Sequence, residues 1–169
     1  FSLNMSTRRN APSMYDLMDV AYELNPLYIR KGNPDLKSSG NHSASISYQL
    51  RNRKIEQTLN FNLSAAVNDN AIASGYSYNK ETGAYTYQRE NVNGNWNGGA
   101  NFNFSRALDK AKLWRVSTRS GARYTHSVDL ERTQNGSASQ RSKVDNLVLS
   151  QAAGLTYQKD KLPVGVNGR

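Results

Sequence analysis

VNGNWNGGANFNFS, residues 92–105, alternates between two kinds of side chain at every step. The even positions carry valine, tryptophan, alanine, phenylalanine and two glycines, whereas the odd positions are asparagine, glycine or serine. Successive side chains of a β-strand point to opposite faces, so this period of two predicts a strand with one apolar and one polar face. The same alternation runs through residues 42–50, 58–68 and 114–128 and, more weakly, 147–157. We therefore expect an all-β fold.

The predicted strands are long, and the connections between them alternate in length. Strands of globular proteins usually run about 5–6 residues, whereas strands of about 9–11 residues, tilted near 45°, cross a lipid bilayer. Short turns are expected at residues 51–54, 108–111 and 159–163, and long loops at 69–91 and 129–145. Tight periplasmic turns and large extracellular loops are typical of outer-membrane barrels. The pattern predicts an antiparallel meander of long strands, a segment of a transmembrane β-barrel.

Aromatic residues fall at two levels along these strands. Those near the short turns are Tyr48, Phe102, Phe104, Trp114 and Tyr157, and those toward the long loops are Trp96, Tyr124 and His126. Aromatic girdles mark both membrane interfaces of such barrels. We therefore expect the apolar face to contact lipid between the two levels, and the polar face to line a watery lumen.

The composition excludes several classes of function. The chain has 169 residues, a formal net charge of +9, no cysteine and two histidines. A disulfide framework and a thiolate metal site are therefore excluded. Because no catalytic constellation is found, we expect no enzyme, no cofactor and no metal. The cations are scattered through turns rather than gathered beside stacking aromatic residues, so nucleic acid is not an expected partner.

The long loop after Asn68 is expected to contain a hairpin of its own. Residues 72–78 and 84–90 flank a turn at 79–83, whose glycine suits a positive φ. Four tyrosines are placed to pair across the hairpin: Tyr76, Tyr78, Tyr85 and Tyr87. They are candidates for ligand binding on an extracellular hairpin, although the favoured interpretation is that they hold the hairpin together.

One strand carries a column of arginines on its polar face. Arg115, Arg119 and Arg123 recur every four residues, so they form a ladder about 13 Å long at roughly 3.3 Å per residue. In a barrel these side chains face the lumen, where they bind a plug domain or guide anionic solutes. Pairing with acids on neighbouring barrel strands or on the plug is at least as good an alternative.

The longest gap between predicted strands spans residues 9–40. Apolar residues recur at helical spacing after Pro12, which predicts one or two helical turns; they are Met14, Leu17, Met18 and Ala21. Further on comes the hexapeptide Gly32, Asn33, Pro34, Asp35, Leu36 and Lys37. Its glycine permits a tight reversal and its proline disfavours helix before it, so the hexapeptide is expected to close the loop and aim the chain into the next strand.

The order of these elements resembles the barrel of TonB-dependent outer-membrane receptors, and most of all the TonB-linked outer membrane protein beta-barrel family. The resemblance spans essentially the whole chain. It is carried by Arg9-Asn-Ala-Pro-Ser13, Asn25-Pro-Leu27, the hexapeptide and Asn68-Asp-Asn-Ala-Ile72. One departure is Ser38-Ser39, where the family usually has Pro-Glu.

The resemblance implies a large barrel with an N-terminal plug domain and a TonB box, in the outer membrane of a Gram-negative bacterium. About seven strands are too few for barrels of eight or more, so residues 1–169 are expected to be one partial β-barrel segment, without the plug domain and the remaining barrel strands. The implied function is the wall of a receptor that takes up a nutrient ligand. The implied partners are outer-membrane lipid, the rest of the barrel with its plug, and TonB.

Two alternative functions stay open. One is a soluble, secreted all-β binding module of the adhesin or carbohydrate-binding type. The other is a small, self-contained outer-membrane barrel, which differs from a receptor segment in its number of strands.

Overall fold

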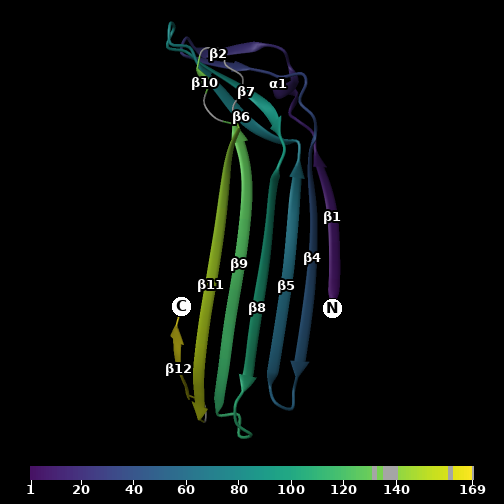
Figure 1. The fold of residues 1–169 in the computed structure, drawn as a ribbon, viewed down its shortest axis with the longest axis vertical. Coiled ribbons are helices and arrows are strands. Elements are labelled where there is room, and N and C mark those ends of the chain that lie inside the picture. The colour runs from purple at the N-terminus through teal and green to yellow at the C-terminus, as the bar shows by residue number, and fades with distance from the viewer. Residues whose placement is uncertain (131–132, 135–140, 160–161, 169) are drawn as a thin grey trace.

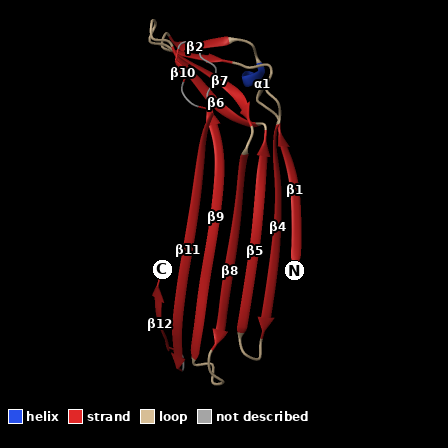
Figure 2. Ribbon diagram, in the orientation of Figure 1, coloured by secondary structure: helices blue, strands red, loops and turns tan. Residues whose placement is uncertain are grey.

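Long antiparallel strands dominate the computed structural model of the protein, which describes residues 1–130, 133–134, 141–159 and 162–168 (Figures 1 and 2). In the described residues, a seven-stranded large sheet has the order β1-β4-β5-β8-β9-β11-β12, with antiparallel neighbours throughout. Its strands are β1 Ser2–Asn10, β4 Ser39–Asn52, β5 Gln57–Asp69, β8 Asn95–Ala107, β9 Trp114–Leu130, β11 Arg141–Lys159 and β12 Leu162–Gly168. The expected antiparallel meander of long strands is confirmed.

The register sorts the side chains of the large sheet into two continuous faces. Leu63 lies opposite Ala100, whereas its neighbour Asn62 lies opposite Asn101, and a slip of one residue would exchange the faces. The apolar face carries Leu3, Met5, Ile46, Leu59, Phe61, Leu63, Trp96, Ala100, Phe102, Phe104, Ala122, Tyr124, Leu149, Leu155 and Tyr157. The polar face carries Asn4, Ser43, Ser47, Asn60, Asn62, Asn97, Asn101, Asn103, Arg119, Asn146 and Ser150.

The apolar face has no second layer over it in the described part of the chain. Met5 is 75% exposed and Leu149 is 70% exposed. The buried apolar residues lie instead toward the ends of the large sheet; they are Leu36, Ala84, Val92, Ala107, Val128 and Leu130. A sandwich in water would bury such a face against a second sheet, so this arrangement counts against the soluble binding module.

Short turns join the strands at one end of the large sheet, as predicted. Residues 53–56 connect β4 to β5, and residues 108–113 connect β8 to β9. Asp109 holds the second turn, because its carboxylate accepts backbone hydrogen bonds from Trp114 at 2.9 Å and Leu113 at 3.1 Å. The hydrogen bond from Trp114 has the largest effect and, together with that from Leu113, holds the pKa of Asp109 below its usual 3.8. The turn expected at 159–163 lies partly outside the described residues.

At the opposite end, the prediction of a loop over residues 129–145 is wrong at both ends. β9 continues to Leu130 and β11 begins at Arg141, and these two residues lie opposite each other. Leu130 is buried, and its Cδ1 lies 3.2 Å from where a Cβ on Gly75 would stand. Gly75 belongs to a second, small sheet, and this contact stabilises the end of β9 beyond the part of its sequence that alternates. Within the expected loop, β10 (Thr133–Gln134) is also described.

A second, small sheet caps this end of the large one (Figure 1). Its order is β10-β6-β7-β3-β2, with β2 Ala21–Asn25, β3 Tyr28–Lys31, β6 Ala71–Tyr78 and β7 Tyr85–Val92. The antiparallel β6–β7 hairpin confirms the prediction, and Gly83 in its turn has a φ of +70°. β3 joins β7, and β10 joins β6, in parallel.

The expectation that residues 9–40 are a gap between strands is wrong, because β2 and β3 form a hairpin there. Asn25 closes its turn by accepting a hydrogen bond from the Leu27 N–H at 2.9 Å. The predicted helical turn is confirmed as α1, Met14–Leu17, but Ala21 begins β2 rather than a second turn. In the described ranges, no helix is long and apolar enough to span a membrane.

Candidate functional site

Two aromatic pairs lie at two heights on the apolar face, whereas Phe102, which was expected near the short turns, lies opposite Ser120 between the two heights. Near the small sheet Trp96 packs on Tyr124, with ring centroids 4.9 Å apart, and near the short turns Trp114 packs on Tyr157 at 4.7 Å. Tyr124 and Trp114 are ten residues apart on β9, about 34 Å of strand. At the 35–45° tilt of barrel strands this becomes a height of roughly 25 Å, that of the apolar band of outer-membrane barrels.

Asp16 is a buried charge that ties α1 to the small sheet. Its side chain is 2% exposed, and its carboxylate accepts hydrogen bonds from Arg30 of β3 at 2.7 Å and from Arg89 of β7 at 2.9 Å. Ser13, the N-cap of α1, donates another at 2.6 Å. Burial raises the pKa of Asp16, but the hydrogen bonds from Ser13 and Arg30 and the charges of both arginines outweigh it, so the pKa lies below 3.8. Asp16 is therefore ionised at neutral pH.

The hexapeptide of residues 32–37 forms a clasp between α1 and the small sheet. A Cβ on Gly32 would lie 1.8 Å from the carbonyl oxygen of Met18, so a larger residue does not fit without movement of the backbone. The Asn33 N–H donates to the carbonyl of Asp16 at 2.6 Å, and the Asn33 side-chain amide donates to a β7 carbonyl at 2.9 Å. One asparagine thus bridges two elements that are distant in sequence.

The far end of the clasp docks on Asn91 of β7. The Asn91 Oδ1 accepts the Lys37 N–H at 2.7 Å, and its Nδ2 donates to the Lys37 carbonyl at 3.0 Å, so the amide satisfies both backbone groups as a paired strand residue would. Between the two ends, Asp35 donates its N–H to the Asn33 Oδ1 at 3.0 Å and Leu36 is buried. The clasp therefore fixes the start of β4 to the small sheet.

Five tyrosines form a cluster on one face of the small sheet: Tyr28, Tyr76, Tyr78, Tyr85 and Tyr87. Tyr76 lies opposite Tyr87 and Tyr78 opposite Tyr85, as predicted, with ring centroids 5.8 and 4.8 Å apart. Tyr28 stacks on Tyr87 at 4.6 Å and was not foreseen, because β3 was not predicted. These rings brace the hairpin, and ligand binding by the four predicted tyrosines stays a prediction.

The Tyr28–Tyr87 pair is also joined through its hydroxyl groups. The Tyr87 hydroxyl donates to the Tyr28 hydroxyl at 2.6 Å. This hydrogen bond, with burial and the neighbouring phenols, raises the pKa of Tyr87 to about 12. Tyr87 is therefore uncharged at neutral pH.

Most of the chain matches a known family. A sequence model of the outer membrane protein beta-barrel family covers residues 1–161. The chain belongs to this family. Searches of curated proteins and of solved structures gave no match. Membership of the outer membrane protein beta-barrel family indicates an outer-membrane location. The large sheet is then a length of barrel wall, whose short turns lie on the periplasmic side, and the small sheet lies outside the cell.

In this outer membrane beta-barrel wall, Arg115, Arg119 and Arg123 share the polar face of β9, as predicted. Arg115 pairs with Glu56 in the β4–β5 turn, which realises the alternative of pairing with an acid. Arg119 donates instead to the Asn103 Oδ1 at 2.8 Å, at the rim of a hollow of about 440 Å³. Their exposure to a lumen stays a prediction, because the opposite wall is not described.

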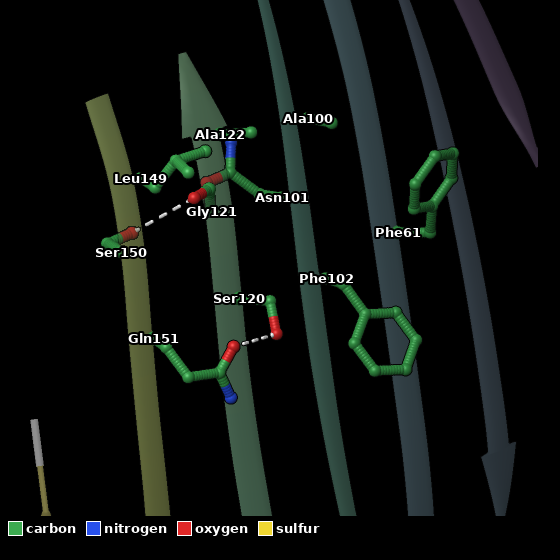
Figure 3. Close-up of a pocket in the computed structure, with 10 residues that line it drawn as sticks. All are labelled: Phe61, Ala100, Asn101, Phe102, Ser120, Gly121, Ala122, Leu149, Ser150 and Gln151. Carbon is green, nitrogen blue, oxygen red and sulfur yellow. Dashed lines mark hydrogen bonds between the residues drawn. The ribbon is translucent and has the colours of Figure 1, made fainter. Parts of the chain in front are cut away.

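The apolar face of the wall carries a small polar group about midway between the two aromatic heights. The Gln151 Oε1 accepts a hydrogen bond from Ser120, and the Gln151 Nε2 donates to the Thr118 Oγ1 at 2.8 Å. Figure 3 shows Ser120 and Gln151 beside Phe102, around a hollow of about 480 Å³. Mutual hydrogen bonding lowers the cost of exposing these groups to hydrocarbon.

The histidines lie near the extracellular end of the wall. His126 Nδ1 is 2.6 Å from a carboxylate oxygen of Asp145, and His42 Nε2 is 3.2 Å from one of Asp69. Among the residues that the structure describes, no group of three or more histidine, aspartate or glutamate side chains is placed to hold a metal ion. The expectations of no metal and no enzyme stay predictions.

Proposed function

We propose that this chain is part of the wall of a TonB-dependent receptor, which takes up a nutrient ligand through the outer membrane of a Gram-negative bacterium. The clasp of residues 32–37 carries the proposal. The hexapeptide that resembles these receptors is the element that fastens an ordered extracellular sheet over the wall. An open pore needs no such sheet, whereas a receptor needs a pre-organised surface for its ligand.

The proposed partners follow from the faces of the wall. Outer-membrane lipid surrounds the apolar face, a plug domain lies within the barrel, and TonB binds the parent protein. The edges of the large sheet, β1 and β12, each have one neighbour among the described strands. Because edges of a transmembrane sheet must be paired, we propose that further strands complete the barrel. We propose no catalytic activity, no cofactor and no nucleic-acid partner.

Growth of two deletion strains tests the transport role. One strain lacks this protein, the other lacks TonB, and both are compared with their parent on a panel of single nutrient sources. We expect at least one nutrient on which both strains fail, while small porin-permeant sources support all three. A nutrient whose use requires this protein, but on which the strain without TonB still grows, contradicts the assignment.

The orientation of the wall is tested with single cysteines, because the chain has none of its own. Lys80→Cys in the β6–β7 turn is expected to react with a membrane-impermeant maleimide on intact cells. Arg53→Cys in the β4–β5 turn is expected to react only after the outer membrane is opened. The opposite pattern of labelling contradicts the orientation.

A further inference from the structure

A hollow beside the tyrosine cluster combines aromatic rings with cationic groups. Its volume is about 260 Å³, and its lining from β3 and β7 includes Tyr28, Arg30, Lys31, Tyr87 and Arg89. Pockets for drug-sized molecules usually measure about 300–1,000 Å³. The hollow therefore suits one ring with its substituent rather than a whole large ligand.

The two arginines are held in place and still have donors to spare. Each gives a nitrogen to the buried carboxylate of Asp16, at 2.7 Å for Arg30 and 2.9 Å for Arg89. Their side chains remain 47% and 45% exposed. A guanidinium group has five N–H donors in a fixed plane, so both groups are oriented by Asp16 without being used up.

The charge of the hollow favours an anion. Arg30 and Arg89 line it, and among the described residues no acidic side chain does. Lys31 follows Arg30 on β3, so its side chain belongs to the other face of the sheet. Asp16 offsets one of the two guanidinium charges and leaves the other. Tyr87, with its pKa raised to about 12, adds no negative charge at neutral pH.

Tyr28 and Tyr87 form a preformed aromatic pair at the hollow. Their rings are stacked on each other, 4.6 Å apart with an interplanar angle of 24°, so a flat ligand packs beside the pair and not between the rings. The Tyr87 hydroxyl donates to the Tyr28 hydroxyl, so a ligand that covers the pair leaves the Tyr87 donor satisfied. A guanidinium group recognises a carboxylate through two parallel hydrogen bonds.

We propose that this hollow binds a planar anion, an aromatic ring that bears a carboxylate, with the ring against Tyr28 and Tyr87 and the carboxylate at Arg30 and Arg89. The inference rests on the proposed receptor function only for the side of the membrane on which the hollow opens. Its chemistry rests on the side chains, so binding needs neither TonB nor transport.

Three probes separate charge from shape in the native protein purified in detergent. Benzoate has both the ring and the charge, benzamide keeps the ring without the charge, and cyclohexanecarboxylate keeps the charge without the flat ring. Binding is measured by ligand-observed NMR titration. We expect benzoate to bind roughly tenfold more tightly than either analogue.

Variants locate the site. Tyr28→Leu and Arg30→Gln are each expected to weaken benzoate binding about fivefold or more. The controls Tyr15→Leu, at an exposed tyrosine outside the cluster, and Arg53→Gln, in a periplasmic turn, are expected to change nothing. Protease resistance of the small sheet checks that each variant stays folded, and benzoate binding by the folded Tyr28→Leu variant is the deciding measurement.

Two results overturn the proposal. Benzamide or cyclohexanecarboxylate binding as tightly as benzoate removes the requirement for charge or for a flat ring. Unchanged benzoate binding in Tyr28→Leu removes the site. A nutrient that requires this protein but not TonB would contradict the proposed transport role and would leave both binding results unaffected, so the two proposals fail separately.

Discussion

Ala152 and Ala153 offer a matched test of the two faces of the wall. Ala153 lies on the apolar face opposite Thr118, and Ala152 lies on the polar face opposite Arg119. Ala153 is four residues from Tyr157, which belongs to the aromatic pair near the short turns. Four residues are about 14 Å of strand and roughly 10 Å of depth at a tilt near 40°. That depth is close to the middle of a band about 25 Å tall, where an arginine facing lipid costs about 2–4 kcal/mol. Ala153→Arg is expected to lower the free energy of unfolding by this amount.

Ala152→Arg is expected to cost less than about 1 kcal/mol, because its new charge faces away from lipid and the described residue opposite it, Arg119, adds a modest like-charge repulsion. Denaturant titration of the native protein in lipid vesicles measures the free energy of unfolding of each variant. The expected loss for Ala153→Arg corresponds to about a 30- to 700-fold change in the folding equilibrium. Because the two variants share residue type, substitution and depth, equal costs would refute the assignment of the faces.

Three further predictions concern α1 and the clasp. Lowering the pH toward about 2 is expected to loosen the small sheet. The stability that ionised Asp16 adds is complete above its unfolded pKa of 3.8 and is lost as the pH falls through its lower folded pKa. Near-UV circular dichroism follows this loss, and Asp16→Asn is expected to abolish the pH dependence. Gly32→Ala is expected to open the clasp, because its Cβ would overlap the Met18 carbonyl; unchanged resistance of the small sheet to protease on intact cells would contradict the clash. Asn91→Leu removes two hydrogen bonds to Lys37 and is expected to cost about 1–3 kcal/mol locally, which hydrogen exchange at the Lys37 amide measures.

The large sheet was open to prediction because its signal is local. Residues 58–68 and 92–105 each alternate by themselves, and their pairing brings Asn62 to Asn101 and Leu63 to Ala100 without further information. The ends of β9 and β11 were not predictable in the same way. Their last residues depend on a contact such as that of Leu130 with the small sheet, which no alternation within the strand reveals.

The small sheet was predicted only in part, because half of it depends on distant partners. β6 and β7 pair across a six-residue connection, residues 79–84, with its own turn signal, so their tyrosines were placed correctly. β2 and β3 have five and four residues, and β3 is stabilised by parallel pairing to β7. Tyr28 and Arg30 were therefore missing from the candidate site. The hexapeptide was recognised by its glycine and proline, but its partner Asn91 lies 54 residues from Lys37.

The pairing of β3 with β7 has a consequence for the order in which the wall is built. β4 and β5 lie between these strands in the chain, and they run across the bilayer and back. Joining Lys37 to Asn91 closes a ring of chain around that hairpin, and the entropy lost on closing a ring grows with its length. Insertion of the β4–β5 hairpin brings the two ends together and removes most of that loss. We therefore expect the extracellular sheet to form after the strands beneath it have been inserted, so that a surface probe for the assembled sheet would report on the maturation of the barrel during biogenesis.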